Sequence, residues 1–176
     1  MVKDYVEESG MRFSIAPVSH FFHIEESQTY KKIKQQGVKS AEFIYLRNYK
    51  NKEVINIIEA RTSSPHPENE VDNEKFIEEI SEKFNDSFLL YLASVSGRQE
   101  KYEAEIPSAL MDIDLKNVDF SFVLVIRKAE KGWLDYIQNK LPVKMRSLIK
   151  TWNISPNAVV VINHNKAIEK GMCLES

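Results

Sequence analysis

Three residues that could do chemistry together, Glu42, Glu59 and Arg61, lie in a largely apolar, strand-like stretch, AEFIYLRNYKNKEVINIIEARTSS, that runs from Ala41 to Ser64. Glu42 is near its start, and Glu59 lies near its end, two residues before Arg61. Carboxylates that face each other in a half-buried site repel, so they either hold a proton or share a cation. Mg²⁺ or Mn²⁺ suits such oxygen ligands, and the Arg61 guanidinium could stabilise charge that builds on a phosphate.

The residues between the two glutamates predict how they are brought together. A two-residue turn at Lys50–Asn51 uses the tolerance of Asn for left-handed backbone. The two flanking strands then pair so that Glu42 faces Glu59. Opposed residues of an antiparallel pair share a face, and Arg61 lies on that same face. Because both faces of this hairpin are apolar, we expect it inside a layered α/β protein.

The rest of residues 1–176 predicts one α/β domain with a mixed central β-sheet flanked by helices. Before the hairpin we expect a strand within 12–24 that is interrupted near Pro17, and then a helix over 25–37. After the hairpin, Asp72 is a plausible N-cap for a long helix. Its apolar stripe has helical spacing and consists of Ile77, Ile80, Phe84, Phe88, Tyr91 and Val95.

The C-terminal part of the chain alternates strands and helices. The runs FSFVLVI and AVVVIN are near-continuous apolar segments of the kind found in central strands. A helical region lies between them, in which Pro142 either kinks one helix or opens a second. Strand, helix and strand in this order imply a parallel, right-handed crossover. The expected inner stripe of the helical region is Leu134, Ile137, Leu141, Met145, Leu148 and Trp152.

Composition excludes several classes of protein. The net charge of −2 provides no global attraction to nucleic acid, so a polyanion site would have to be local. The longest apolar runs are too short to span a bilayer, and the N-terminus lacks the apolar core of a signal peptide. The single cysteine, Cys173, allows no disulfide within the chain, which is typical of a protein in the reducing cytoplasm.

Local basic groups provide a candidate surface for nucleic acid. Four of them lie on the polar side of the late helical region: Lys140, Lys144, Arg146 and Lys150. Such residues can contact a phosphate backbone without reading sequence, although a charged helix face can also be simply solvated. Ser63 and Ser64 follow the acidic strand and are candidates for backbone contacts nearby.

The acidic strand carries a resemblance to a known family. Glu42, followed by Glu59-Ala60-Arg61 at the end of a strand and then by a helix, resembles the core of the PD-(D/E)xK nucleases. The resemblance implies a restriction-endonuclease-like core with Glu42 and Glu59 as metal ligands, Arg61 as a catalytic residue, and Glu26 as an accessory metal ligand. Glu42 replaces the usual aspartate, and Arg61 replaces the usual lysine. Arginine keeps the charge but cannot be deprotonated.

Three interpretations remain open at this stage. The first is a metal-dependent nuclease that hydrolyses phosphodiesters, with DNA favoured over RNA as the substrate. This interpretation includes no membrane partner and allows a homodimer. The second is a non-enzymatic nucleic-acid- or protein-binding module on the same fold. In the third, Glu42 and Glu59 are glutamates at a sheet edge, one of them paired with Arg61.

Overall fold

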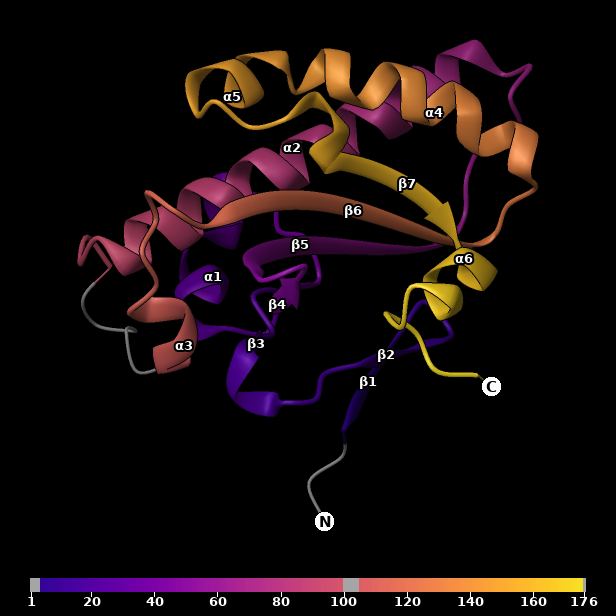
Figure 1. The fold of residues 1–176 in the computed structure, drawn as a ribbon. Coiled ribbons are helices and arrows are strands. Elements are labelled where there is room, and N and C mark those ends of the chain that lie inside the picture. Colours follow the sequence, from indigo (N-terminus) through magenta and orange to yellow (C-terminus); the bar gives the residue numbers. More distant parts are fainter. Residues whose placement is uncertain (1–3, 100–104, 176) are drawn as a thin grey trace.

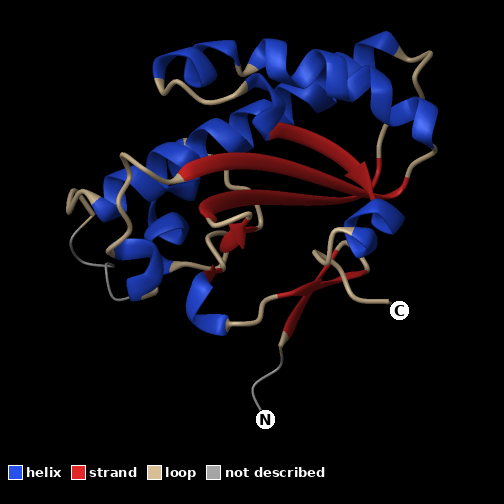
Figure 2. Ribbon diagram, in the orientation of Figure 1, coloured by secondary structure: helices blue, strands red, loops and turns tan. Residues whose placement is uncertain are grey.

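The protein is built around a five-stranded mixed sheet, with a separate two-stranded hairpin near the N-terminus (Figure 1). The computed structural model describes residues 4–99 and 105–175. Helices α2, α4 and α5 cover one face of the sheet, and the β1–β2 hairpin and α6 lie on the other (Figure 2). The α/β class with a mixed central sheet, predicted from the sequence, is confirmed.

The elements have the following bounds. The strands are β1 (Tyr5–Glu8), β2 (Met11–Ser14), β3 (Phe21–Phe22), β4 (Phe43–Tyr49), β5 (Lys52–Ser63), β6 (Asp119–Lys128) and β7 (Val159–Asn163). The α-helices are α1 (Gln28–Ile33), α2 (Glu70–Val95), α3 (Ser108–Met111), α4 (Lys131–Lys144), α5 (Arg146–Thr151) and α6 (His164–Glu169). Short 3-10 turns occupy Val18–His20, Lys34–Gln36 and Pro156–Ala158. None of the described helices is long and apolar enough to cross a bilayer.

The β4–β5 hairpin has the register predicted from the sequence. Lys50 and Asn51 are both left-handed, with φ of 50° and 64°, and so form the expected two-residue turn. Ile44 pairs with Ile57, and beyond the ladder the Glu42 N–H donates to the carbonyl of Ile58 at 3.0 Å. The start of β4 therefore lies beside the part of β5 that contains Glu59.

The sheet order is β3-β4-β5-β6-β7, so β5 is the central strand. β4 is antiparallel to β3 and β5, whereas β5, β6 and β7 are parallel to one another. The chain crosses from β5 to β6 through α2 and from β6 to β7 through α4. These are the parallel crossovers expected when apolar strands alternate with helices.

Alternation along β5 divides its side chains between two cores. Ile55 and Ile57 face α2 and α4 and belong to the larger apolar cluster. Ile58 and Ala60 belong to the smaller cluster, which the N-terminal hairpin and α6 cover. By the same alternation, Glu59 continues the face that packs against α2. The stripe predicted on α2 packs against this face. Its buried members are Ile77, Ile80, Phe84, Phe88 and Tyr91, and Val95 is partly buried.

Two helix starts were placed wrongly. The first helix begins at Gln28, because Ser27 is its N-cap and Ser27 Oγ accepts from the Tyr30 N–H at 3.1 Å. Glu26 therefore precedes the helix and is not on its inner face. The long helix begins at Glu70 with Asn69 as N-cap, and Asn69 Oδ1 accepts from the Asp72 N–H at 3.2 Å. Asp72 is thus a first-turn residue of that helix.

The predicted inner stripe of the late helical region is correct only as far as Met145. Pro142 lies within α4, and the helix breaks at Met145, which joins α4 to α5. In α5, Ile149 is buried and Leu148 is only partly buried. Trp152 is 41% exposed, although its ring still contacts that of Phe88 with centroids 5.0 Å apart.

Candidate functional site

Four glutamates and a histidine gather where β3 ends, β4 begins and β5 approaches its end. We call Glu8, His23, Glu25, Glu42 and Glu59 the acid cluster. Their mutual proximity is visible in their electrostatics, because burial raises the pKa of Glu8 and of Glu42 and neighbouring members of the cluster add to that rise. The cluster includes Glu42 and Glu59, which the sequence predicted would face each other, and it adds three residues that sequence reasoning missed.

Glu59 is a buried carboxylate that cations contact directly. Its residue exposure is 0%. Lys83 Nζ from α2 lies 2.9 Å from Glu59 Oε1 and 3.1 Å from Oε2. Arg61 Nε lies 2.8 Å from Oε1, as an ion pair that is poorly aligned for a hydrogen bond. Burial raises the pKa of Glu59, and the charges of Lys83 and Arg61 oppose that rise.

Lys83 is a site residue that the sequence analysis missed. It lies three residues after Ile80, on the part of α2 that packs against β5, and its side chain is only 15% exposed. A lysine beside the apolar stripe of a helix that follows an acidic strand is the signal that could have found it. An ammonium group that is this buried requires a carboxylate partner.

Arg61 is held between two carboxylates. It contacts Glu59 on its own strand, and its Nη2 forms an ion pair with Glu79 Oε1 on α2. The guanidinium also lies over the Phe76 ring, 5.9 Å from the centroid. Arg61 therefore helps to fasten α2 to β5, while its side chain remains 28% exposed.

Glu42 is in a different electrostatic environment from Glu59. It is 8% exposed, and its Oε2 has no hydrogen-bond partner. Burial, a side-chain hydrogen bond with Glu25 and repulsion from Glu59 raise the pKa of Glu42 to about 9. Without a cation, Glu42 holds a proton at neutral pH. An unsatisfied buried polar atom costs about 1–3 kcal/mol, so this oxygen is a natural place for a ligand.

Glu8 and His23 lie on the accessible side of Glu42. His23 Nε2 is 3.3 Å from Glu8 Oε1, and both side chains are about one quarter exposed. One ligand atom each from Glu8, His23 and Glu42 lies within 4.8 Å of the other two, and this is the one set of three or more metal-ligating residues identified within residues 4–99 and 105–175. Burial raises the pKa of Glu8 and lowers that of His23.

Glu26, the predicted accessory metal ligand, does not point into the cluster. Its side chain is 62% exposed, and its Oε2 accepts from Lys31 Nζ at 2.8 Å. That contact lowers the pKa of Glu26. Glu26 is close enough to add negative charge around Glu8 and His23. A role as a metal ligand would require the pair with Lys31 to break.

The predicted basic surface lies away from the acid cluster. Its four members, on α4 and α5, are exposed: Lys140, Lys144, Arg146 and Lys150. Lys144 Nζ is 3.8 Å from Glu78 on α2, whereas the neighbouring Glu79 contacts Arg61 on β5. None of these four basic residues is among the charges that shift the pKa of Glu8, Glu42 or Glu59. Ser63 and Ser64 follow Glu59 closely at the end of β5, and Ser64 Oγ is buried without a hydrogen-bond partner.

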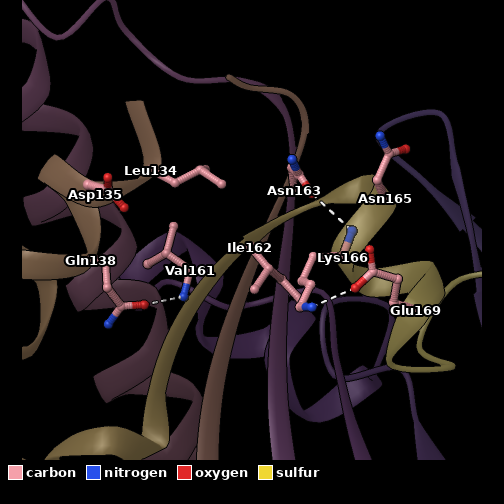
Figure 3. A pocket seen from close by; sticks show the side chains of 9 residues that line it. All are labelled: Leu134, Asp135, Gln138, Val161, Ile162, Asn163, Asn165, Lys166 and Glu169. Atoms are coloured by element: carbon pink, nitrogen blue, oxygen red, sulfur yellow. Dashed lines mark hydrogen bonds and ion pairs between the residues drawn. The ribbon is translucent and has the colours of Figure 1, made fainter. Parts of the chain in front are cut away.

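A separate cavity of about 410 Å³ lies between α4, β7 and α6 (Figure 3). Gln138 there donates to the Val159 carbonyl and accepts from the Val161 N–H, both at 2.8 Å. It therefore satisfies backbone groups of β7, the last strand in the sheet order. Lys166 and Glu169, which both lie on α6, form an ion pair at the side of the cavity. No member of the acid cluster lines it.

Replacing Lys83 with methionine should destabilise the fold by about 2–4 kcal/mol, because Glu59 would keep a buried charge with Arg61 as its remaining close cation. Urea unfolding at pH 8 measures this change. A Glu59→Gln/Lys83→Met double variant should recover most of the loss. As a control, Lys39→Met removes an exposed pair with Glu82 and should cost less than about 1 kcal/mol. A loss for Lys83→Met no larger than that of this control would contradict the description of Glu59.

The stability of the protein in EDTA should fall as pH rises from about 5 to about 9. Between the ordinary pKa of 4.5 and the folded value of about 9, the folded state retains the proton on Glu42 and the unfolded state releases it. Glu42→Gln removes this contribution. The free energy of unfolding of the Glu42→Gln variant minus that of wild type should therefore be larger at pH 9 than at pH 5, by at least about 2 kcal/mol. Parallel pH profiles would show that Glu42 ionises normally.

The chain matches no model of a known protein family, no curated protein sequence and no solved structure. The function is therefore inferred from the chemistry of the protein's own side chains. The chemically distinctive features among the described residues are the unpartnered carboxylate oxygen of Glu42 and the buried charge of Glu59.

Proposed function

We propose that the chain is a metal-dependent nuclease, or a degenerate relative of one, that hydrolyses phosphodiesters of nucleic acid, DNA in preference to RNA. The observation that carries this proposal is the buried, unpartnered Glu42 oxygen next to the Glu59–Lys83 ion pair at one end of the sheet. The order of elements supports it, since a helix, the acid-bearing strand pair, a long helix and a strand follow one another as the resemblance to PD-(D/E)xK nucleases implies.

The residues present fit a divalent cation such as Mg²⁺ or Mn²⁺ at Glu42 better than at Glu59. Glu42 has a free oxygen, whereas Lys83 binds both oxygens of Glu59 and Arg61 contacts one of them. A cation bound to Glu42 would offset the repulsion that raises the pKa of that carboxyl. Such an ion acts as a Lewis acid on a phosphoryl oxygen and lowers the pKa of bound water.

Lys83 offers the ammonium group that the sequence motif lacks. Arg61 occupies the position of the usual lysine, two residues after Glu59, and it is fixed by Glu59 and Glu79. Lys83 reaches the same Glu59 carboxylate from α2. In this proposal Glu42 binds the cation, Glu59 orients Lys83 and Arg61, and these two cations stabilise negative charge on the phosphate. Ser63, Ser64 and the basic residues of α4 and α5 would contact the backbone.

A non-enzymatic binding module on the same fold is the second candidate. This candidate is favoured because Lys83 and Arg61 already contact the Glu59 carboxylate, which leaves it less available to a metal ion. In addition, neither Glu42 nor Glu59 lines the cavity of about 410 Å³ beside α4, β7 and α6, whose lining consists of other described residues. Such a module would retain phosphate contacts through Lys140, Lys144, Arg146 and Lys150 without hydrolysis.

Incubating supercoiled plasmid with the protein and either Mg²⁺ or Mn²⁺ tests the enzymatic proposal. We expect metal-dependent nicking that Glu42→Gln reduces at least about a hundredfold. Thermal unfolding of this variant in EDTA shows whether it folds, so that loss of activity can be separated from unfolding. Glu26→Gln is the matched control, because it removes an exposed acid next to the cluster, and it should leave nicking nearly unchanged.

The remaining outcomes separate the two candidates. An intact plasmid in both metals, together with retarded DNA in a gel shift, would support the binding module instead. The gel shift should then weaken when Lys140 and Lys144 are replaced by alanine, and the dependence of binding on salt should become shallower. A protein that neither nicks nor binds DNA or RNA would end the nucleic-acid proposal.

A further inference from the structure

We infer that Glu8, His23 and Glu42 form a binding site for a divalent transition-metal ion, Mn²⁺ or Zn²⁺, in preference to Mg²⁺. The site differs from the one the sequence predicts, which combines Glu42 with Glu59 and Glu26. The inference concerns metal binding alone, and it holds whether or not the chain cleaves a phosphodiester.

The spacing of the three side chains is close to that of ligands on one ion. Metal–ligand bonds of about 2.1 Å place neighbouring ligands roughly 3–4 Å apart. His23 Nε2 and Glu8 Oε1 are already 3.3 Å apart, and every pair in the triad lies within 4.8 Å. Rotation of partly exposed side chains at Glu8 and His23 can close the remaining distance, since each is about one quarter accessible.

An independent feature of Glu42 points to a ligand. This residue is more than nine-tenths buried, yet its Oε2 has no hydrogen-bond partner. Buried polar atoms are almost always satisfied by protein, water or an ion. A cation between Glu8, His23 and Glu42 would satisfy this oxygen and would neutralise the carboxylates that otherwise repel one another.

The three ligands come from separate elements that hydrogen bonds hold together. Glu8 ends β1, and the next residue, Ser9, donates its hydroxyl to the Ala60 carbonyl on β5 at 3.0 Å. His23 directly follows β3, which pairs with β4. Glu42 precedes β4, and its carbonyl accepts from the Glu25 N–H at 3.3 Å. The N-terminal hairpin therefore delivers a ligand to the rim of the main sheet.

The ligand types select the ion. An imidazole nitrogen with two carboxylates suits Zn²⁺ or Mn²⁺, whereas Mg²⁺ prefers oxygen ligands and retains several waters. The imidazole nitrogen that would bind the ion is His23 Nε2, which lies 3.3 Å from Glu8 Oε1. Three protein ligands leave positions for water or a substrate oxygen, as in catalytic metal sites.

The other acids nearby are already engaged. Both oxygens of Glu59 contact Lys83, one of them also contacts Arg61, and Glu26 is paired with Lys31. Glu25 hydrogen-bonds to the side chain of Glu42 and so could orient this ligand from behind.

Titrating the full-length protein with Mn²⁺, with free Mn²⁺ followed by electron paramagnetic resonance, tests the site directly. Competition with a chromophoric chelator measures Zn²⁺. We expect one ion per chain, with Zn²⁺ bound more tightly than Mn²⁺ and Mg²⁺ weakest. His23→Gln and Glu8→Gln should each weaken Mn²⁺ binding at least about tenfold. His20→Gln and Glu26→Gln, which alter neighbouring residues outside the triad, should leave the affinity within about twofold.

Thermal unfolding in EDTA shows whether each variant folds, so loss of binding in a folded His23→Gln protein is informative. Unchanged Mn²⁺ affinity in both His23→Gln and Glu8→Gln would overturn the site, as would absence of Mn²⁺ and Zn²⁺ binding by wild type. Binding that is lost only with Glu59→Gln would instead place the ion at the Glu42–Glu59 pair. Mn²⁺ binding with no plasmid nicking would leave this site intact and reject only the enzymatic proposal.

Discussion

The contact between Glu59 and Lys83 is the constraint on which the arrangement of this site depends. A carboxylate with no exposed surface on the central strand of a sheet is tolerated only if cations contact it. Lys83 meets that requirement from α2, and Arg61 meets it from the same strand while also pairing with Glu79 on α2. These contacts fix how α2 lies across β5, in addition to the apolar packing of its inner stripe.

The same contacts explain why two opposed glutamates behave differently. The cationic groups of Lys83 and Arg61 contact Glu59. The environment of Glu42 instead consists of burial, the carboxyl of Glu25 and repulsion from neighbouring acids, all of which raise its pKa. The result is one carboxylate that is engaged by cations and one that retains a proton and an unpartnered oxygen. A metal ion bound to Glu42 would resolve that imbalance, and the N-terminal hairpin brings Glu8 to the position where such an ion would lie.

The sequence was most informative where local pattern determines structure. The left-handed tolerance of Asn51 and the alternation of apolar residues were sufficient to predict the register of β4 against β5, and helical spacing was sufficient to predict the buried stripe of α2. The N-caps Ser27 and Asn69 were missed, because several adjacent polar residues could each serve as an N-cap. In those two cases the N-cap is identified by the backbone N–H group that donates to its side chain.

The rest of the site depends on contacts between residues distant in sequence. Nothing local to Glu8 or His23 indicates that they meet, since the position of Glu8 depends on contacts such as the Ser9–Ala60 hydrogen bond, whose partners are 51 residues apart in sequence. Lys83 is likewise one lysine among several on a charged helix until the fold places it on Glu59. The sequence pattern identifies Glu42 and Glu59 as acidic residues in apolar strands. The residues that contact them are determined by tertiary packing.

A crystal of the protein soaked in Mn²⁺, with anomalous diffraction data, would test the central claim most directly. We predict an anomalous peak about 2.0–2.4 Å from oxygens of Glu8 and Glu42 and from His23 Nε2, with Lys83 still bound to Glu59. A peak beside Glu59 with Lys83 displaced would contradict this prediction, and so would a Mn²⁺-soaked crystal without a peak near Glu42.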